Sequence, residues 1–417
     1  MTLFEVSGAV LTAVAIFGYI NHRFIRLPDT LGTTVVGLVA SLVLLLFGFS
    51  GSGVRQAQAL IQHIDFSEVV FHGLLGLLLF AGSLHVNFSE LKTRLLPIFL
   101  LATLGVVSST LVVGYGLHYG LLLAGQPIPL LHCLVFGALI SPTDPIAVLG
   151  ILKKAGAPKN VELKITGESL FNDGTAVVAF LLLLGLASGK GAPTVGGTML
   201  LLVKEVAGGI GLGLLLGWGV VRLLRDVDSY LVEILTTLAA AIGGYGLAEA
   251  LHVSAPLTVV VAGLMVGNKG ATRAMSEATR EHLFSFWTLL DEILNLVLFG
   301  LIGIMILALS FGLENIVAAA IAIPVVLIAR WLSVVVSLGL SRVERGSEPH
   351  AVKVLTWGGL RGGISIALAL SLPQLEGRPM LITASYAVVL FSLLVQAPTL
   401  GPLIERLRRE DAVPGRR

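Results

Sequence analysis

Five charged residues lie inside long apolar stretches of this sequence: Asp144, Glu168, Asp173, Arg330 and Arg361. A charged side chain at the centre of a lipid bilayer costs at least about 2.5–3.5 kcal/mol on insertion scales, so such residues usually mark a route for ions or polar solutes. The residues around each charge indicate what that route could carry.

Asp144 lies in the stretch Ser141-Pro142-Thr143-Asp144-Pro145. Each proline removes a backbone donor, so the carbonyls of Ala138 and Ser141 lose their helical partners. Unpaired backbone at membrane depth is tolerated only where it is buried in protein or lines a wet cavity. Free carbonyls, a hydroxyl and a carboxylate predict a cradle for a small cation. The alternative is a kinked helix whose aspartate is satisfied by water.

A polar cluster follows in the stretch Gly167-Glu168-Ser169-Leu170-Phe171-Asn172-Asp173-Gly174. At helical spacing Ser169 and Asp173 share one face, with Glu168 and Asn172 beside them. Two carboxylates, an amide and a hydroxyl within two turns of an apolar helix indicate an ion site. A purely structural polar cluster is the alternative.

A second break is predicted where four glycines flank Arg361, in Thr356-Trp357-Gly358-Gly359-Leu360-Arg361-Gly362-Gly363. The other arginine, Arg330, needs a carboxylate partner if it is buried. Glu168 is the predicted partner, because it lies about 140° around the helix from Asp173 and need not face the same ion. The alternative for Arg330 is a side chain that reaches the membrane surface.

The composition is that of a polytopic membrane protein. Of 417 residues, 55% are hydrophobic and 12% charged, about half the charge of a typical soluble protein. Apolar runs near the roughly 20 residues of a membrane-spanning helix recur to residue 404, which excludes a lone secretion signal. The single Cys133 excludes an internal disulfide framework and a cysteine metal site. No basic block indicates nucleic acid.

Thirteen hydrophobic spans are predicted within one membrane domain, residues 1–405, followed by a short tail, 406–417. The ninth span is short, and Asp291, Glu292 and Asn295 lie near the start of the tenth, so both could be partly re-entrant or interfacial. The spans cover about 5–22, 30–50, 66–86, 95–122, 130–151, 163–187, 197–221, 229–250, 255–268, 284–310, 313–341, 351–373 and 379–403.

The loop charges predict the orientation. Twenty-one of the 27 Lys and Arg residues fall in loops on the C-terminal side of this topology, four on the other side and two inside spans. Cytoplasmic loops carry the excess of Lys and Arg. We therefore expect an integral protein of a bacterial inner (plasma) membrane, with the N-terminus outside and the C-terminus in the cytoplasm.

The two breaks occupy corresponding positions if spans one to six and eight to thirteen are repeats linked by span seven. Matching broken helices in two halves, with the substrate between them near the midplane, are typical of inverted-repeat transporters. The expected fold class is an all-α membrane protein of thirteen transmembrane helices in two inverted six-helix repeats.

At these residues the sequence resembles the NhaP/NHE branch of the monovalent cation/proton antiporters. The resemblance rests on four motifs in order: Ser141–Pro145, Gly167–Asp173, Ile328-Ala329-Arg330 and Trp357–Gly362. It implies exchange of Na⁺, with Li⁺ and K⁺ as open alternatives, for H⁺ by alternating access and without any cofactor. It also implies electroneutral exchange, because Asn172-Asp173 stands where electrogenic relatives have two aspartates.

The resemblance further implies a homodimer with crossing broken helices, in which a mobile core moves as an elevator against an interface domain. The core would comprise about 95–187 and 313–403, the interface domain about 5–86 and 229–310, and the linker span about 197–221.

By position in the motifs, Asp173 would carry the cation or the proton. Thr143, Asp144 and Ser169 would complete the Na⁺ site, with Asn172 beside them. Glu168 would pair with Arg330 and stabilise the core, and Arg361 would compensate charge. One departure concerns span three: many relatives have an acidic residue where this chain has Phe80-Ala81-Gly82-Ser83-Leu84, and Asn87 replaces a common aspartate.

Two other classes compete with an antiporter. An intramembrane aspartyl protease also uses aspartates on neighbouring spans, but such enzymes share a Gly-x-Gly-Asp motif, whereas Phe171-Asn172 precedes Asp173 here. A sodium-coupled symporter of an organic solute could share the broken helices, and would need a roomier polar cavity. The tight polar cluster favours a bare cation and a protein that is not an enzyme.

Overall fold

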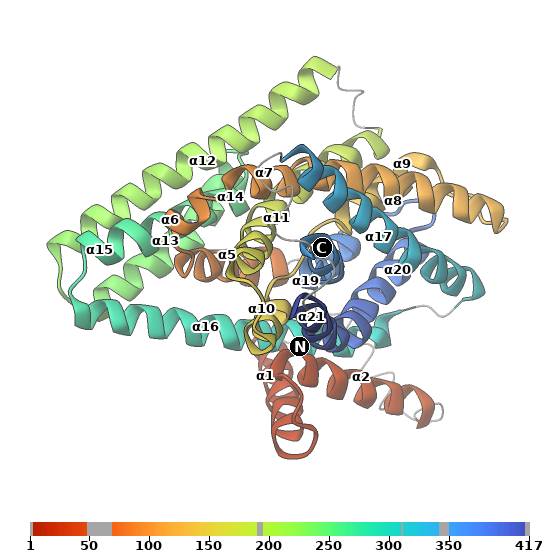
Figure 1. Ribbon diagram of the computed structural model, residues 1–417, viewed down its shortest axis with the longest axis horizontal. Coiled ribbons are helices and arrows are strands. Elements are labelled where there is room, and N and C mark those ends of the chain that lie inside the picture. The colour runs from red at the N-terminus through yellow and green to blue at the C-terminus, as the bar shows by residue number, and fades with distance from the viewer. Residues whose placement is uncertain (1–2, 48–68, 190–194, 310–311, 342–349, 413–417) are drawn as a thin grey trace.

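The computed structural model describes residues 3–47, 69–189, 195–309, 312–341 and 350–412, and the regular structure in these ranges is helical (Figure 1). Helices satisfy their own backbone hydrogen bonds, as the waterless bilayer interior requires. The expected all-α class is confirmed. Parts of the predicted spans and tail (48–50, 66–68, 310 and 413–417) lie outside the described residues.

The helices follow one another along almost every described range. In chain order they are α1 (Leu3–Ile20), α2 (Asp29–Phe47), α5 (Leu75–Leu84), α6 (Phe88–Lys92), α7 (Leu95–Ala102), α8 (Leu104–Leu123), α9 (Leu130–Leu139), α10 (Ile146–Ala155), α11 (Lys159–Ala187), α12 (Val195–Asp226), α13 (Tyr230–Ala250), α14 (Ala255–Met265), α15 (Ala271–Arg273), α16 (Glu277–Ile304), α17 (Leu313–Leu340), α18 (Ala351–Trp357), α19 (Gly363–Leu370), α20 (Arg378–Phe391) and α21 (Ala397–Ala412). Short π-helical or 3₁₀ turns adjoin some of them: Asn21–Ile25, Val69–Leu74, Val266–Gly270, Met305–Ala308 and Ser392–Gln396.

Nine helical segments within the described ranges are long and apolar enough to cross a bilayer. They coincide with nine of the expected spans. The other four expected spans, the third, fifth, ninth and twelfth, contain shorter or interrupted helices: α5, α9 with α10, α14, and α18 with α19. The chain is therefore a polytopic membrane protein, and crossing by all thirteen expected spans stays a prediction.

The helices pack mainly within two groups (Figure 1). In one group α17 packs along α8 and α20, α8 along α9, and α11 against α7 and α9. In the other, α16 packs along α2 and α1, and α14 against α5, α12 and α13. One cluster of buried apolar side chains lies within the first group and another mainly within the second, while a third joins α2 and α16 to α19 and α20. The groups meet where α11 contacts α5 and α14, and where α16 contacts α19.

Two interrupted helices meet inside the molecule. The first break separates α9 from α10 and contains Pro142 and Pro145, and the second separates α18 from α19. The backbone N–H of Asp144 donates to the carbonyl of Leu360 at 2.8 Å, which joins one break to the other. Both expected breaks are therefore present, and each supplies a hydrogen-bond partner that the other lacks.

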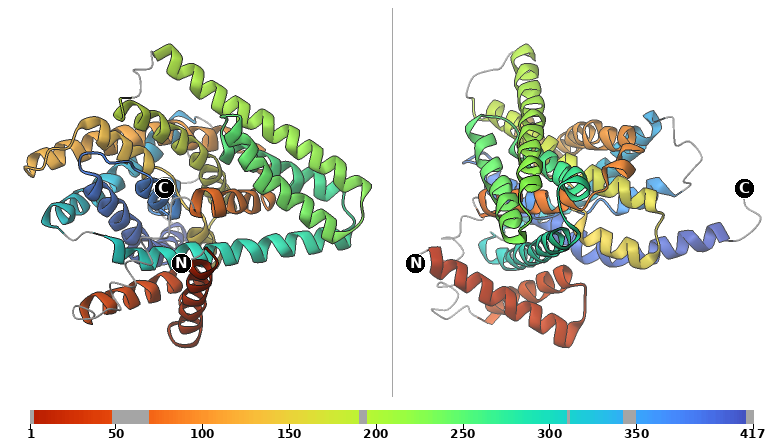
Figure 2. Two further views of the ribbon diagram at one scale, coloured as in Figure 1. Left: turned by 180° about the vertical axis from the view of Figure 1, so that it is seen from behind. Right: turned by 90° about the vertical axis from the view of Figure 1, so that its left-hand side faces the viewer.

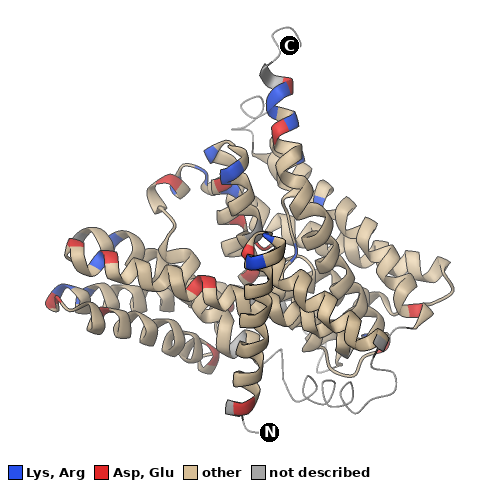
Figure 3. Ribbon diagram, turned by 90° about the horizontal axis from the view of Figure 1, so that it is seen from below, with Lys and Arg blue, Asp and Glu red and all other residues tan. Residues whose placement is uncertain are grey.

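The ends of the described chain lie on opposite sides of the molecule. Figure 2 shows α1 beginning on one side and α21 ending on the other. Lys and Arg are sparse along the long helices and gather near helix ends, including the end of α21 (Figure 3). The helix α21 continues to Ala412, so the described part of the expected tail is helical.

Close packing of α14 against α5 leads to the first prediction. Gly267, just after α14, lies so close to Leu84 that an added Cβ would come within 2.8 Å of the Leu84 carbonyl carbon and 3.0 Å of its Cα. We expect Gly267→Ala to lower stability by about 1–3 kcal/mol, because backbone atoms cannot move aside as a flexible side chain can. Melting in detergent measures it. Gly243→Ala on α13 is the control, since no atom beyond its own stretch of helix lies within 4 Å of its added Cβ. Equal melting temperatures for both variants would contradict the prediction.

Candidate ion-binding site

A hydrogen-bonded group of small polar side chains joins α11 to the first break. Thr143, Ser169 and Asn172 are each at most 4% exposed. The Thr143 and Ser169 hydroxyl oxygens lie 2.9 Å apart, and the Asn172 amide donates to Thr143 Oγ1 at 2.8 Å. These bonds orient two hydroxyl oxygens beside Asp173, one turn further along α11 from Ser169.

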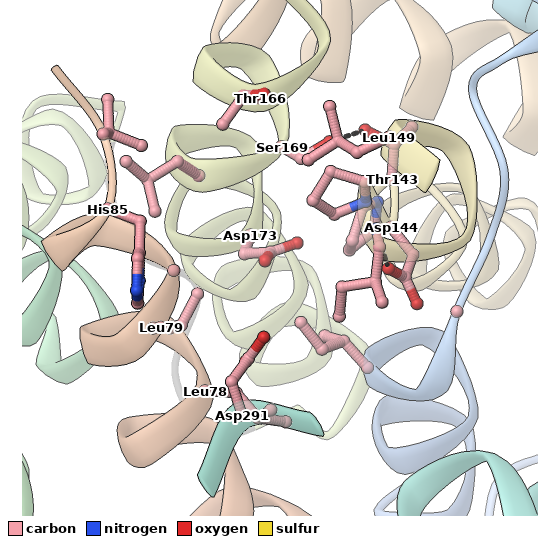
Figure 4. Close-up of a pocket in the computed structure, with 18 of the residues that line it drawn as sticks. Leu78, Leu79, His85, Thr143, Asp144, Leu149, Thr166, Ser169, Asp173 and Asp291 are labelled. Carbon is pink, nitrogen blue, oxygen red and sulfur yellow. Dashed lines mark hydrogen bonds between the residues drawn. The ribbon is translucent and has the colours of Figure 1, made fainter. Parts of the chain in front are cut away.

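Asp173 is the least satisfied member of this group. Its side chain is buried, and its Oδ1 atom has no hydrogen-bonding partner among the described residues. The carboxylate projects into a cavity of about 400 Å³ between the two helix groups (Figure 4). A buried charge without a partner is costly. The site is therefore suited to a group that arrives through the cavity and supplies positive charge, either a small cation or a proton.

The cavity leads from Asp173 toward the connection between α10 and α11. Lys153 in the last turn of α10, Lys159 at the start of α11 and Glu162 one turn later all line it. This connection is one of the Lys-rich loops of the chain. The carboxylate is thus reached from the side that carries the basic loops.

Asp144 lines the same cavity, but one of its oxygens is already engaged. Its Oδ1 accepts a hydrogen bond from the Ile146 N–H at 2.9 Å, at the start of α10. A Cβ on Gly362 would come within 2.8 Å of the Asp144 Cγ, so the close approach of the second break requires glycine there. The carboxylate therefore lies near the N-terminal ends of α10 and α19, both of which favour negative charge.

Arg361 donates hydrogen bonds to carbonyls just after the C-terminal end of α9. Its guanidinium donates from Nη1 to the Ser141 carbonyl and, at 3.1 Å, to the Pro142 carbonyl. The Ala138 carbonyl accepts from the Ser141 N–H at 3.1 Å. The predicted cradle of free carbonyls at Ala138 and Ser141 is therefore wrong, because a tighter turn and an arginine from the second break use both carbonyls.

The expected ion pair between Glu168 and Arg330 is present. Both side chains are buried; Arg330 Nη2 lies 2.9 Å from Glu168 Oε2, and Nη1 contacts Oε1. Nε and Nη2 of Arg330 also donate to the Leu355 carbonyl at 3.2 and 2.9 Å. One arginine thus joins α11, α17 and α18, and its carboxylate partner is not among the residues that line the cavity.

The second helix group also contributes an acidic residue to the cavity, Asp291 of α16. Ala81 in α5 is fully buried and offers no carboxylate, whereas Asp291 lines the cavity and points toward Asp173 in Figure 4. From sequence, Asp291 could equally have been an interfacial residue. The spacing of Thr288, Asp291 and Asn295 was the available signal, because it places three polar side chains on one helix face.

The comparisons with known proteins agree with this architecture. A family model described as "Sodium/hydrogen exchanger, transmembrane" matches residues 11–406. The chain belongs to this sodium/hydrogen exchanger family.

Three similar proteins match nearly the whole chain. The Na(+)/H(+) antiporter NhaP of Pseudomonas aeruginosa is 46% identical over 411 residues, which are 97% of each chain. The Na(+)/H(+) antiporter ApNhaP of Aphanothece halophytica is 35% identical over 96% of this chain and 73% of its own. The solved structure of the sodium proton antiporter MjNhaP1 from Methanocaldococcus jannaschii at pH 8 matches with a TM-score of 0.73 at 19% identity, over 98% of this chain and 99% of that one. This chain therefore shares its fold.

The buried ion pair of this exchanger generates the second prediction. Breaking one side of a buried pair typically costs about 3–5 kcal/mol, because the remaining charge is left uncompensated. We expect Glu168→Gln and Arg330→Gln each to lower the melting temperature in detergent. The double variant should lose less than the two single losses added together, since it leaves no orphan charge. Strictly additive shifts would show that the two side chains do not stabilise one another.

Proposed function

We propose that this chain exchanges Na⁺ for H⁺ across the membrane by alternating access, with Asp173 binding either ion. The observation that supports this most is a buried carboxylate, without a fixed positive partner among the described residues, at a cavity that leads to one side of the membrane. The similar NhaP proteins are antiporters of these two ions by name, and membership of the exchanger family supports the same activity.

The proposed Na⁺ site consists of oxygen ligands, which hard cations prefer. Asp173 supplies the charge, and the Thr143 and Ser169 side chains line the same cavity beside it. The Asp144 carboxylate adds negative charge, with one oxygen held by the start of α10. Asn172 orients Thr143 through its amide. In the proton-loaded state, the Asp173 carboxyl group is neutral and needs no cation.

The exchange is electroneutral in this proposal. Asn172 is neutral, Glu168 is balanced by Arg330, and Asp144 keeps its charge throughout the proposed cycle, so the charge of the site changes only at Asp173. One Na⁺ or one proton brings this carboxylate to the same net charge. Each half of the cycle then moves a site of equal charge across the membrane.

The two helix groups serve as the moving and stationary parts of the proposed cycle. Residues 95–187 and 313–403 form the mobile core, residues 5–86 and 229–310 the interface domain of a homodimer, and 197–221 the linker. The packing within each group and the position of the cavity between them support this division. With the N-terminus outside and the tail in the cytoplasm, the cavity faces the cytoplasm.

The third prediction tests the carrier residue. We expect Asp173→Asn to abolish Na⁺-dependent dissipation of a pH gradient in everted vesicles, because an amide cannot exchange a proton for a cation. Its melting temperature should stay the same or rise, since an unpaired buried charge is removed. Asp226→Asn, at the exposed end of α12, should retain full exchange. Substantial Na⁺-driven proton movement by Asp173→Asn would refute the assignment.

A further inference from the structure

We propose that Asp291 of α16 supplies a second negative charge to the cation that binds Asp173 while the cavity is open. The proposal rests on the proposed exchange activity. Its starting point is geometric: Asp291 lines the wall opposite Thr143 and Ser169, and its carboxylate points toward Asp173 (Figure 4).

The surroundings of Asp291 hold it toward the cavity. Thr288, one turn earlier on α16, also lines the cavity, and its hydroxyl lies 3.0 Å from Nε2 of His85 at the end of α5. The same hydroxyl donates to the Phe284 carbonyl at 2.8 Å. Asn295 lies one turn later on the same face of α16. The polar face of α16 is thus held in place through Thr288.

The charges at the inner end of the cavity favour a cation. Within the described residues, no Lys or Arg forms an ion pair with Asp291, and the basic residues that line the cavity, Lys153 and Lys159, lie at its Lys-rich end. At the other end the charged groups are all negative, namely Asp144, Asp173 and Asp291. A cleft lined by one sign of charge concentrates counter-ions by about 10-fold or more.

The location of Asp291 in α16 makes its effect one-sided. The helix α16 packs with α1 and α2, in the group proposed to stay still, whereas Asp173 lies in α11 of the proposed core. When the core moves, Asp173 leaves Asp291 behind. Asp291 should therefore assist cation binding only in the state in which the cavity is open, and not on the opposite face of the membrane.

Kinetics on the two faces test the proposal. Everted vesicles present the cavity side to added Na⁺, and right-side-out vesicles present the other side. We expect Asp291→Asn to raise the KM for Na⁺ about 10-fold in everted vesicles, with the maximal rate within twofold of wild type. In right-side-out vesicles its KM should not change. Asp291→Glu should restore most of the affinity, because it keeps the charge.

Glu292→Gln is the matched control, since this neighbouring carboxylate is exposed and is not among the residues that line the cavity. Its kinetics should equal those of wild type on both faces. Asp291→Ser supplies a second neutral variant if Asp291→Asn does not assemble. An unchanged KM, an equal rise on both faces, or a loss confined to the maximal rate would overturn the role of Asp291. Absence of Na⁺-dependent proton flux in the wild type would instead overturn the exchange activity.

Discussion

The cost of keeping a charge inside a membrane governs this structure. Glu168 is matched by Arg330 through two hydrogen bonds, and Arg361 binds carbonyls at the end of α9. Asp144 accepts the first free N–H of α10. The buried Oδ1 of Asp173 has no partner in the described residues. The other four charged side chains each have a protein partner, and Asp173 is available to a mobile ion.

The two helix breaks make this arrangement possible. Prolines free backbone groups at the first break, and those groups are satisfied by Arg361 and by the Leu360 carbonyl of the second. Glycine at position 362 lets the second break approach the Asp144 carboxylate closely. The breaks therefore stabilise one another while they place Thr143 against Ser169 and Asn172 of α11. Transport chemistry and stability depend on the same contacts.

Much of this could be predicted from the sequence, because local rules apply. Proline and glycine positions predicted both breaks, helical spacing predicted the polar face of α11, and the need to neutralise Arg330 predicted its pairing with Glu168. The fate of the Ala138 and Ser141 carbonyls could not be predicted, because it depends on Arg361, far away in the chain. Asp291 was ambiguous for a similar reason, since only the packing of α16 against α5 and α19 decides that it faces the cavity.

Proton release on Na⁺ binding tests the central claim most directly, namely that one carboxylate holds either ion. Purified protein in weak buffer would be titrated with Na⁺, while bound radioactive Na⁺ and released protons are counted together. If Asp173 is the shared site, competition requires about one proton to leave for each Na⁺ that binds at a pH where the site is protonated, and higher pH should strengthen Na⁺ binding reciprocally. Na⁺ binding without proton release at such a pH, or release that persists in Asp173→Asn, would contradict the account.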